Sequence, residues 1–139
     1  MKIFTWEQNG AIEIARASDG WLFDFPLCPS TNTRMIQSRG FLLLSREARE
    51  YQTERSREAW LWKRKTGFKP IDSYTQVELW FILPRRSCDC HNYFKVFFDT
   101  LEKAELVTDD RYLVPLVRGL WHDSSYPRVI VKLPDRRNA

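Results

Sequence analysis

The sequence has few of the features that mark secreted or membrane proteins. It contains three cysteines, and an odd number does not suggest a disulfide framework, which fits a reducing compartment. No stretch approaches the ~20 apolar residues of a membrane-spanning helix. The first residues also lack the apolar run of a signal peptide. We therefore expect a cytoplasmic protein with no membrane segment.

The length and the charge pattern suggest a small domain with one basic segment. A chain of 139 residues with 14% aromatics can bury one hydrophobic core, so we expect a single domain. Residues 34–69 hold ten Lys/Arg against four Glu, while the rest of the chain carries a net charge of −2. This segment suits a surface that faces a polyanion. It equally suits a solvated helix with Arg–Glu pairs, and both interpretations stay open.

The hydrophobic pattern predicts an α/β (α+β) fold, with a small mixed sheet and two main helices. Asn9-Gly10 is a strong hairpin-turn signal between two β-prone runs. Ser45 can cap the first helix, which is rich in arginine. We expect helices at about 46–64 and 92–104, and strands at 2–7, 11–16, 21–25, 40–44, 76–83, 111–117 and 128–132.

The first helix has two kinds of residues with a predicted role. Its basic residues could lie along phosphates, which would set salt-dependent affinity rather than sequence choice. These residues are Arg46, Arg49, Arg55, Arg57, Lys63, Arg64 and Lys65. Its buried seam should contain Ala48, Tyr51, Ala59 and Trp62. Trp60, Trp62 and Trp80 could stack on bases, although core or dimer packing is the more frequent role of such residues.

Two acidic positions flank the second helix and point to a metal site. Asp89 stands where the helix begins, and Asp110 stands where the chain leaves it for the next strand. Hard divalent cations prefer oxygen ligands, and Mg²⁺ usually takes only one or two protein carboxylates. If both acids converge across the helix, they could build a phosphoryl-transfer site, with Lys95 stabilising transition-state charge. The alternative is an ordinary Asp helix cap with an unrelated turn acid downstream.

Four motifs, taken together, resemble the RusA family of Holliday junction resolvases. They are Pro29-Ser30-Thr31-Asn32 with Arg34, Asp89-x-His91-Asn92-x-x-Lys95, Asp99-Thr100-Leu101-x-Lys103-Ala104, and Asp109-Asp110. The similarity runs from about Phe23 to Leu133, so residues 21–133 would be the shared core and residues 1–20 an extra hairpin. The resemblance implies a small homodimeric endonuclease of bacteria or prophages that depends on Mg²⁺ or Mn²⁺. Its substrate would be branched DNA in recombination and repair.

The resemblance also implies residue roles. Asp89 and Asp110 fall on positions that hold the metal and carry catalysis, and Lys95 falls on the active-site lysine. Candidate nucleic-acid contacts are Asn32, Arg34, Asn92, Arg85 and Arg86.

His91 departs from the family pattern, because the family usually has an aspartate there. A neutral imidazole suits Mn²⁺ better than Mg²⁺. We expect a working site in which His91 is a third ligand or a proton carrier. The alternative is a weakened metal site in a protein that binds junctions without cutting them. A smaller departure is Glu105, at a position that is often glycine in the family.

The run Cys88-Asp89-Cys90-His91 also raises the possibility of zinc. Structural zinc needs four Cys/His ligands, and only Cys28 and His122 remain outside the run. Alternation in an extended segment instead predicts that the two cysteines point inward while Asp89 and His91 point outward. We expect His122 to be a loop residue.

Overall fold

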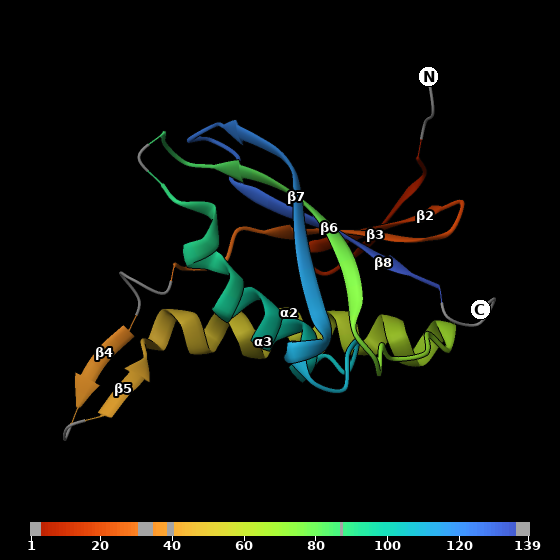
Figure 1. The fold of residues 1–139 in the computed structure, drawn as a ribbon, viewed down its shortest axis with the longest axis horizontal. Helices are drawn as coiled ribbons and strands as arrows, with labels where there is room; N and C mark the ends of the chain where they lie inside the picture. Colours follow the sequence, from red (N-terminus) through yellow and green to blue (C-terminus); the bar gives the residue numbers. More distant parts are fainter. Residues whose placement is uncertain (1–3, 31–34, 39–40, 87, 136–139) are drawn as a thin grey trace.

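The computed structural model describes residues 4–30, 35–38, 41–86 and 88–135. They form a mixed six-stranded sheet with two helices, as the sequence predicted (Figure 1). The strand order is β1-β2-β3-β8-β6-β7, and β6–β7 is the parallel pair among antiparallel neighbours. The strands are β1 (Trp6–Asn9), β2 (Ile12–Ala17), β3 (Gly20–Pro26), β6 (Thr75–Leu83), β7 (Leu113–His122) and β8 (Arg128–Pro134).

A second, two-stranded ribbon stands apart from this sheet. It consists of β4 (Met35–Ser38) and β5 (Phe41–Leu44), which pair antiparallel at the start of the first long helix (Figure 1). The prediction of a strand at 40–44 agrees with β5, although residue 40 lies outside the described residues. The strand β4 was not predicted, because its sequence follows a turn-rich stretch and carries little alternation.

The N-terminal hairpin is fastened to the first helix. Gly10 adopts a left-handed φ of 64° at the turn between β1 and β2, as the Asn-Gly signal predicted. The Glu58 carboxylate accepts a hydrogen bond from the Ala11 N–H at 2.8 Å. A Cβ at position 10 would collide with the Glu58 carboxylate, so another residue here would displace Glu58 from the Ala11 N–H.

The first long helix, α2 (Arg46–Thr66), begins and ends at the expected signals. The Ser45 hydroxyl accepts a hydrogen bond from the Ala48 N–H at 3.2 Å, and Gly67 ends the helix in the left-handed region. Both helices lie on one side of the sheet (Figure 1). Trp62 is the main anchor of α2 in the core, 2% exposed, with its ring edge-on to those of Trp21 and Phe23.

The second helix, α3 (Phe94–Lys103), starts later than predicted. A 3₁₀ turn, η1 (Cys90–Tyr93), precedes it, so the expected helix at 92–104 is shorter by two residues at its beginning. Its buried side chains lie at i, i+3/i+4 spacing, namely Val96, Phe97, Phe98, Thr100 and Leu101.

The α3 helix ends at the glycine-like position of the family pattern. Glu105 has φ 61°, in the left-handed region that glycine favours. Its carboxylate accepts hydrogen bonds from Trp60 Nε1 at 3.0 Å and Lys63 Nζ at 3.2 Å, which help to stabilise this conformation. The departure therefore affects how the helix ends, as expected.

Strand β7 corrects two sequence predictions. Residues 110–112 form a 3₁₀ turn, η2 (Asp110–Tyr112), so the strand does not begin at Arg111. It extends to His122, which is the last residue of a strand and not a loop residue. The strand is this long because β7 pairs with β6 along the whole length of β6. A register shift after Leu79 keeps the two strands paired up to His122.

Candidate active site

The candidate site begins where the chain leaves β6 and enters η1 and α3. Asp89 and His91 are exposed, and Asp89 Oδ1 lies 3.8 Å from His91 Nδ1. Cys88 and Cys90 pack against the core, so the predicted alternation is confirmed. Asp89 occupies the N-cap position of η1, yet its side chain makes no capping hydrogen bond. Asp89 therefore stands at the cap position without capping η1 through its side chain, and its role as a metal ligand stays a prediction.

The polar stripe of α3 carries the predicted lysine and a second acid. Lys95 Nζ lies 3.5 Å from Asp99 Oδ2, one helical turn further along. The Asp99 carboxyl also lies within hydrogen-bonding reach of Asp110. Desolvation raises the pKa of Asp99 to about 6, and the Asp110 carboxyl raises it as well, against the lowering effect of Lys95. The α3 helix thus brings a carboxyl pair and an ammonium group together.

Asp110 is held in place by neighbouring acids. It belongs to a group with Glu102 and Asp109 whose ligand oxygens all lie within 4.8 Å of one another. Glu102 Oε1 accepts the Asp110 N–H at 2.7 Å, while Asp109 Oδ1 accepts the Arg111 N–H at 3.0 Å. These two acids therefore have partners in the backbone, and they fix the turn that presents the Asp110 carboxylate.

This donor set fits a hard divalent cation. Carboxylate oxygens are the ligands that Mg²⁺ and Mn²⁺ prefer. Among the described residues, Glu102, Asp109 and Asp110 form the group of side chains that lie close enough together to share a metal ion. This group contains neither cysteine nor histidine. A zinc site built from the Cys88–His91 run therefore has no support in this part of the chain.

The predicted site residues fall into two groups in the structure. One group is Asp89 with His91 before α3, and the other is Lys95 and Asp99 on α3 with Asp110 on the η2 turn after it. The acidic cluster of the described residues does not include Asp89, so the convergence of Asp89 and Asp110 on one ion stays a prediction.

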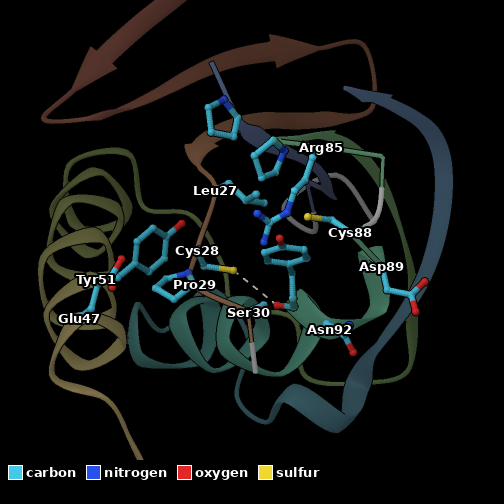
Figure 2. A pocket seen from close by; sticks show the side chains of 13 residues that line it. Leu27, Cys28, Pro29, Ser30, Glu47, Tyr51, Arg85, Cys88, Asp89 and Asn92 are labelled. Carbon is cyan, nitrogen blue, oxygen red and sulfur yellow. Dashed lines mark hydrogen bonds between the residues drawn. The ribbon is translucent and has the colours of Figure 1, made fainter. Parts of the chain in front are cut away.

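The structure describes three of the five residues that were predicted to contact DNA. Asn92 is half-buried and lines a hollow beside Asp89 (Figure 2). Arg85 and Arg86 are exposed just before the acidic motif. Asn32 and Arg34 lie outside the described residues.

Two residues of the site had no role in the sequence prediction. Asp99 and Glu102 continue the stripe that starts at Lys95, at i+4 and i+7, which is the spacing of one helix face. That spacing was a usable signal. It could not reveal that Glu102 would bond to the backbone of Asp110, because that contact depends on how the chain turns after α3.

The basic segment on α2 contains ion pairs with glutamates, and its contact with a polyanion stays a prediction. Arg55 pairs with Glu54 and Glu58, and Lys63 pairs with Glu105. Arg57, in contrast, is exposed and has no ion pair among the described residues. Of the tryptophans, Trp62 is a core residue. Base stacking by Trp62 is therefore ruled out.

The molecule is an α+β protein with a lysine on α3 and carboxylates clustered at the end of that helix and in the turn that follows it. The family profile "Endodeoxyribonuclease RusA" matches residues 24–134, most of the chain. The protein therefore belongs to the RusA family of Holliday junction endodeoxyribonucleases, metal-dependent phosphodiester hydrolases of DNA recombination and repair. No curated protein matches the chain. None of the helices in the described ranges is long and apolar enough to span a membrane.

The carboxyl pair predicts that neutralising Asp99 stabilises the metal-free protein. In EDTA at pH 7.5, Asp99→Asn should raise the free energy of unfolding by about 1–2 kcal/mol, because a half-buried carboxylate beside Asp110 is no longer ionised. A raised carboxyl pKa means that the folded state binds this proton more tightly. The contribution of Asp99 to stability therefore falls as pH rises from about 4 to about 6.

Urea unfolding of both proteins across pH 3.5–8 measures this effect. The difference between wild type and Asp99→Asn should shrink steadily as the pH falls from about 6 towards 3.5, where the carboxyl also becomes protonated in the unfolded chain. A variant that is less stable than wild type at pH 7.5 would contradict the prediction.

Proposed function

We propose that this protein resolves four-way DNA junctions through paired, metal-dependent hydrolysis of phosphodiester bonds. Asp89, His91 and Asp110 would hold Mg²⁺ or Mn²⁺, with Asp99 beside Asp110. A bound ion of this kind would activate water and stabilise the charge on the leaving oxygen. The observation that carries the proposal is the position of the Asp110 carboxylate beside Asp99, which is the ion-pair partner of Lys95, while Glu102 accepts the backbone N–H of Asp110.

The protein side chains have separate tasks in this proposal. Lys95 is 68% exposed, so its ammonium can reach a phosphate that approaches α3 and neutralise charge in the transition state. Glu102 and Asp109 hold the η2 turn, so that the Asp110 side chain would need little reorganisation to bind the divalent ion. Arg86 and the exposed Arg57 would bind the DNA backbone without reading its sequence.

Nicking of a synthetic four-way junction tests the proposal. Wild type with Mg²⁺ or Mn²⁺ should give symmetric nicks in two opposing strands, and Asp89→Asn should remove them. Junction binding without nicks under either metal would favour the alternative, a DNA-binding protein with a weakened metal site.

The histidine in the acidic motif predicts an altered metal preference. His91→Asp adds an anionic oxygen ligand, so nicking in Mg²⁺ should rise about tenfold relative to nicking in Mn²⁺. His91→Asn is the matched control, because it supplies an oxygen without the charge. Position 91 is exposed, so neither change should affect folding. An unchanged ratio of the two rates in His91→Asp would show that this side chain does not face the ion.

We also propose that the working form is a homodimer acting in the cytoplasm, with the chain as one RusA-like domain and residues 1–20 as an added hairpin. Paired nicks related by two-fold symmetry require two sites. The sheet face away from the helices supports a second copy, because Trp6, Trp80 and Trp121 border an apolar hollow of about 460 Å³ there. Sedimentation should give twice the chain mass of 16.7 kDa. A monomer under nicking conditions would refute this arrangement.

A further inference from the structure

An arginine follows directly after Asp110, and its side chain lies at the border of the acidic cluster. Arg111 Nε is 3.6 Å from Asp109 Oδ2, and the Arg111 side chain is 64% exposed. Asp109 and Asp110 belong to the same group of carboxylates, whose ligand oxygens lie within 4.8 Å of one another. The Arg111 guanidinium is therefore beside the proposed metal site and open to solvent, where a DNA strand would approach.

Two tyrosines hold this side chain in place. The guanidinium carbon of Arg111 lies over the Tyr112 ring, 5.0 Å from its centroid, and Nη2 donates a hydrogen bond to the Tyr112 hydroxyl at 3.2 Å. Tyr112 itself packs against the hydrophobic core. An exposed arginine usually samples many rotamers. Because these contacts restrict Arg111 already in the free protein, less conformational entropy is lost when it binds a ligand.

The second tyrosine is brought here by the parallel pairing of β6 with β7. Thr75 pairs with Leu113 at the start of these strands, and the residues just before them, Tyr74 and Tyr112, also lie side by side. Their rings meet edge-on with the centroids 5.3 Å apart, and Tyr74 is 72% exposed. This end of the sheet therefore presents an aromatic support for Arg111 next to the η2 turn.

The chemistry of Arg111 points to a phosphate as its ligand. Its Nη1 donors have no hydrogen-bond partner among the described residues. A guanidinium binds phosphate oxygens through two parallel hydrogen bonds. Neighbouring phosphates of one DNA strand are only about 3.4 Å apart along the helix axis. A strand whose scissile phosphate lies at Asp110 therefore brings an adjacent phosphate close to Arg111.

We propose that Arg111 binds a phosphate next to the scissile one, and that Tyr112 and Tyr74 position its guanidinium for this contact. The inference rests on the proposed nuclease function. It adds to the acidic motif a cation that holds the DNA strand in place over Asp110. The contact is to the DNA backbone and so carries no base preference.

Junctions in which single phosphates are replaced by neutral methylphosphonates test this contact. In Ca²⁺, wild type should lose about tenfold in affinity when one particular phosphate near the crossing point is replaced. Arg111→Ala should bind the unmodified junction about tenfold more weakly, and should lose only about threefold or less when that phosphate is replaced. A wild type without such a phosphate, or an Arg111→Ala variant with the full loss there, would overturn the proposal.

Arg118→Ala is the matched control for this experiment. Arg118 is also an arginine of the β7 region, is 55% exposed, and pairs with one acid, Glu78, at 3.1 Å. It lies outside the acidic cluster. The ratio of affinities for modified and unmodified junction is the readout, and Arg118→Ala should keep the wild-type ratio at every phosphate. A ratio that falls equally in Arg118→Ala and Arg111→Ala would also overturn the proposal.

Tyr74→Ala tests the positioning role of the tyrosines. Its ring is exposed, so its removal should leave thermal unfolding unchanged. The loss at the sensitive phosphate should fall to about threefold, because Tyr112 and Arg111 are less firmly held. Tyr74→Phe keeps the ring and should restore the wild-type loss. A Tyr74→Ala variant with the full tenfold loss would refute the positioning role.

Nicking assays separate this inference from the proposed function. If the methylphosphonate effect depends on Arg111 but no junction is nicked in Mg²⁺ or Mn²⁺, the nuclease function fails and the phosphate contact stands. If junctions are nicked symmetrically and the effect does not depend on Arg111, the phosphate contact fails alone.

Discussion

Replacing Asp110 with asparagine should lower the rate of junction nicking by about a thousandfold or more. The change keeps the shape of the side chain and removes one negative charge from the proposed metal site. The Glu102 carboxylate bonds to the backbone N–H of residue 110, so the η2 turn should persist in the variant. Single-turnover nicking in Mg²⁺ and in Mn²⁺ measures the effect. Junction affinity in Ca²⁺ should change much less.

The control for this variant is Glu105→Gln, which also removes one acid near the end of α3. Glu105 bonds to Trp60 and Lys63, away from the acidic cluster, so its loss should leave nicking within about threefold of wild type. Thermal unfolding should find Asp110→Asn no less stable than wild type without metal, because a carboxyl beside Asp99 has been neutralised. Nicking by Asp110→Asn at a tenth of the wild-type rate or more would remove Asp110 from the catalytic machinery.

Replacing Lys95 with alanine should lower the nicking rate about a hundredfold at saturating junction. The ammonium is exposed, and its partner in the structure is Asp99 at 3.5 Å. An exposed ion pair contributes little to stability, so the loss should appear in the catalytic rate and not in folding. Lys95→Arg should retain more activity than Lys95→Ala, because it keeps the positive charge.

Arg57→Ala separates transition-state stabilisation from DNA binding. Arg57 is exposed on α2 without an ion pair among the described residues, so its removal should weaken junction binding and flatten the dependence of affinity on salt. Its rate at saturating junction should stay near that of wild type. If Lys95→Ala behaves in the same way, with affinity lost and the saturated rate kept, then Lys95 is a backbone contact and not a catalytic group.

Local signals in the sequence were sufficient for most elements of the fold. The turn at Gly10, the cap at Ser45 and the alternation along β6 depend on neighbouring residues, and each formed where predicted. The first strand, expected at 2–7, is instead β1 at Trp6–Asn9, directly before the turn. The long strand β7 was underestimated, because its last residues have no strong pattern of their own. They are strand because β6 lies beside them, and a partner strand is not visible in local sequence.

The candidate site could likewise be predicted from the sequence only in part. The family membership was readable from the sequence alone, because the RusA profile matches residues 24–134, and the acid, lysine and acid pattern around α3 nominated Asp89, Lys95 and Asp110 as candidates. The contact of Asp99 with Asp110 and the hydrogen bond by which Glu102 fixes the η2 turn became visible in the folded chain and not before. Each of these contacts joins side chains that belong to separate elements or to the two sides of a turn. Their distances depend on how the elements pack on the sheet, which residue identity and spacing do not encode locally.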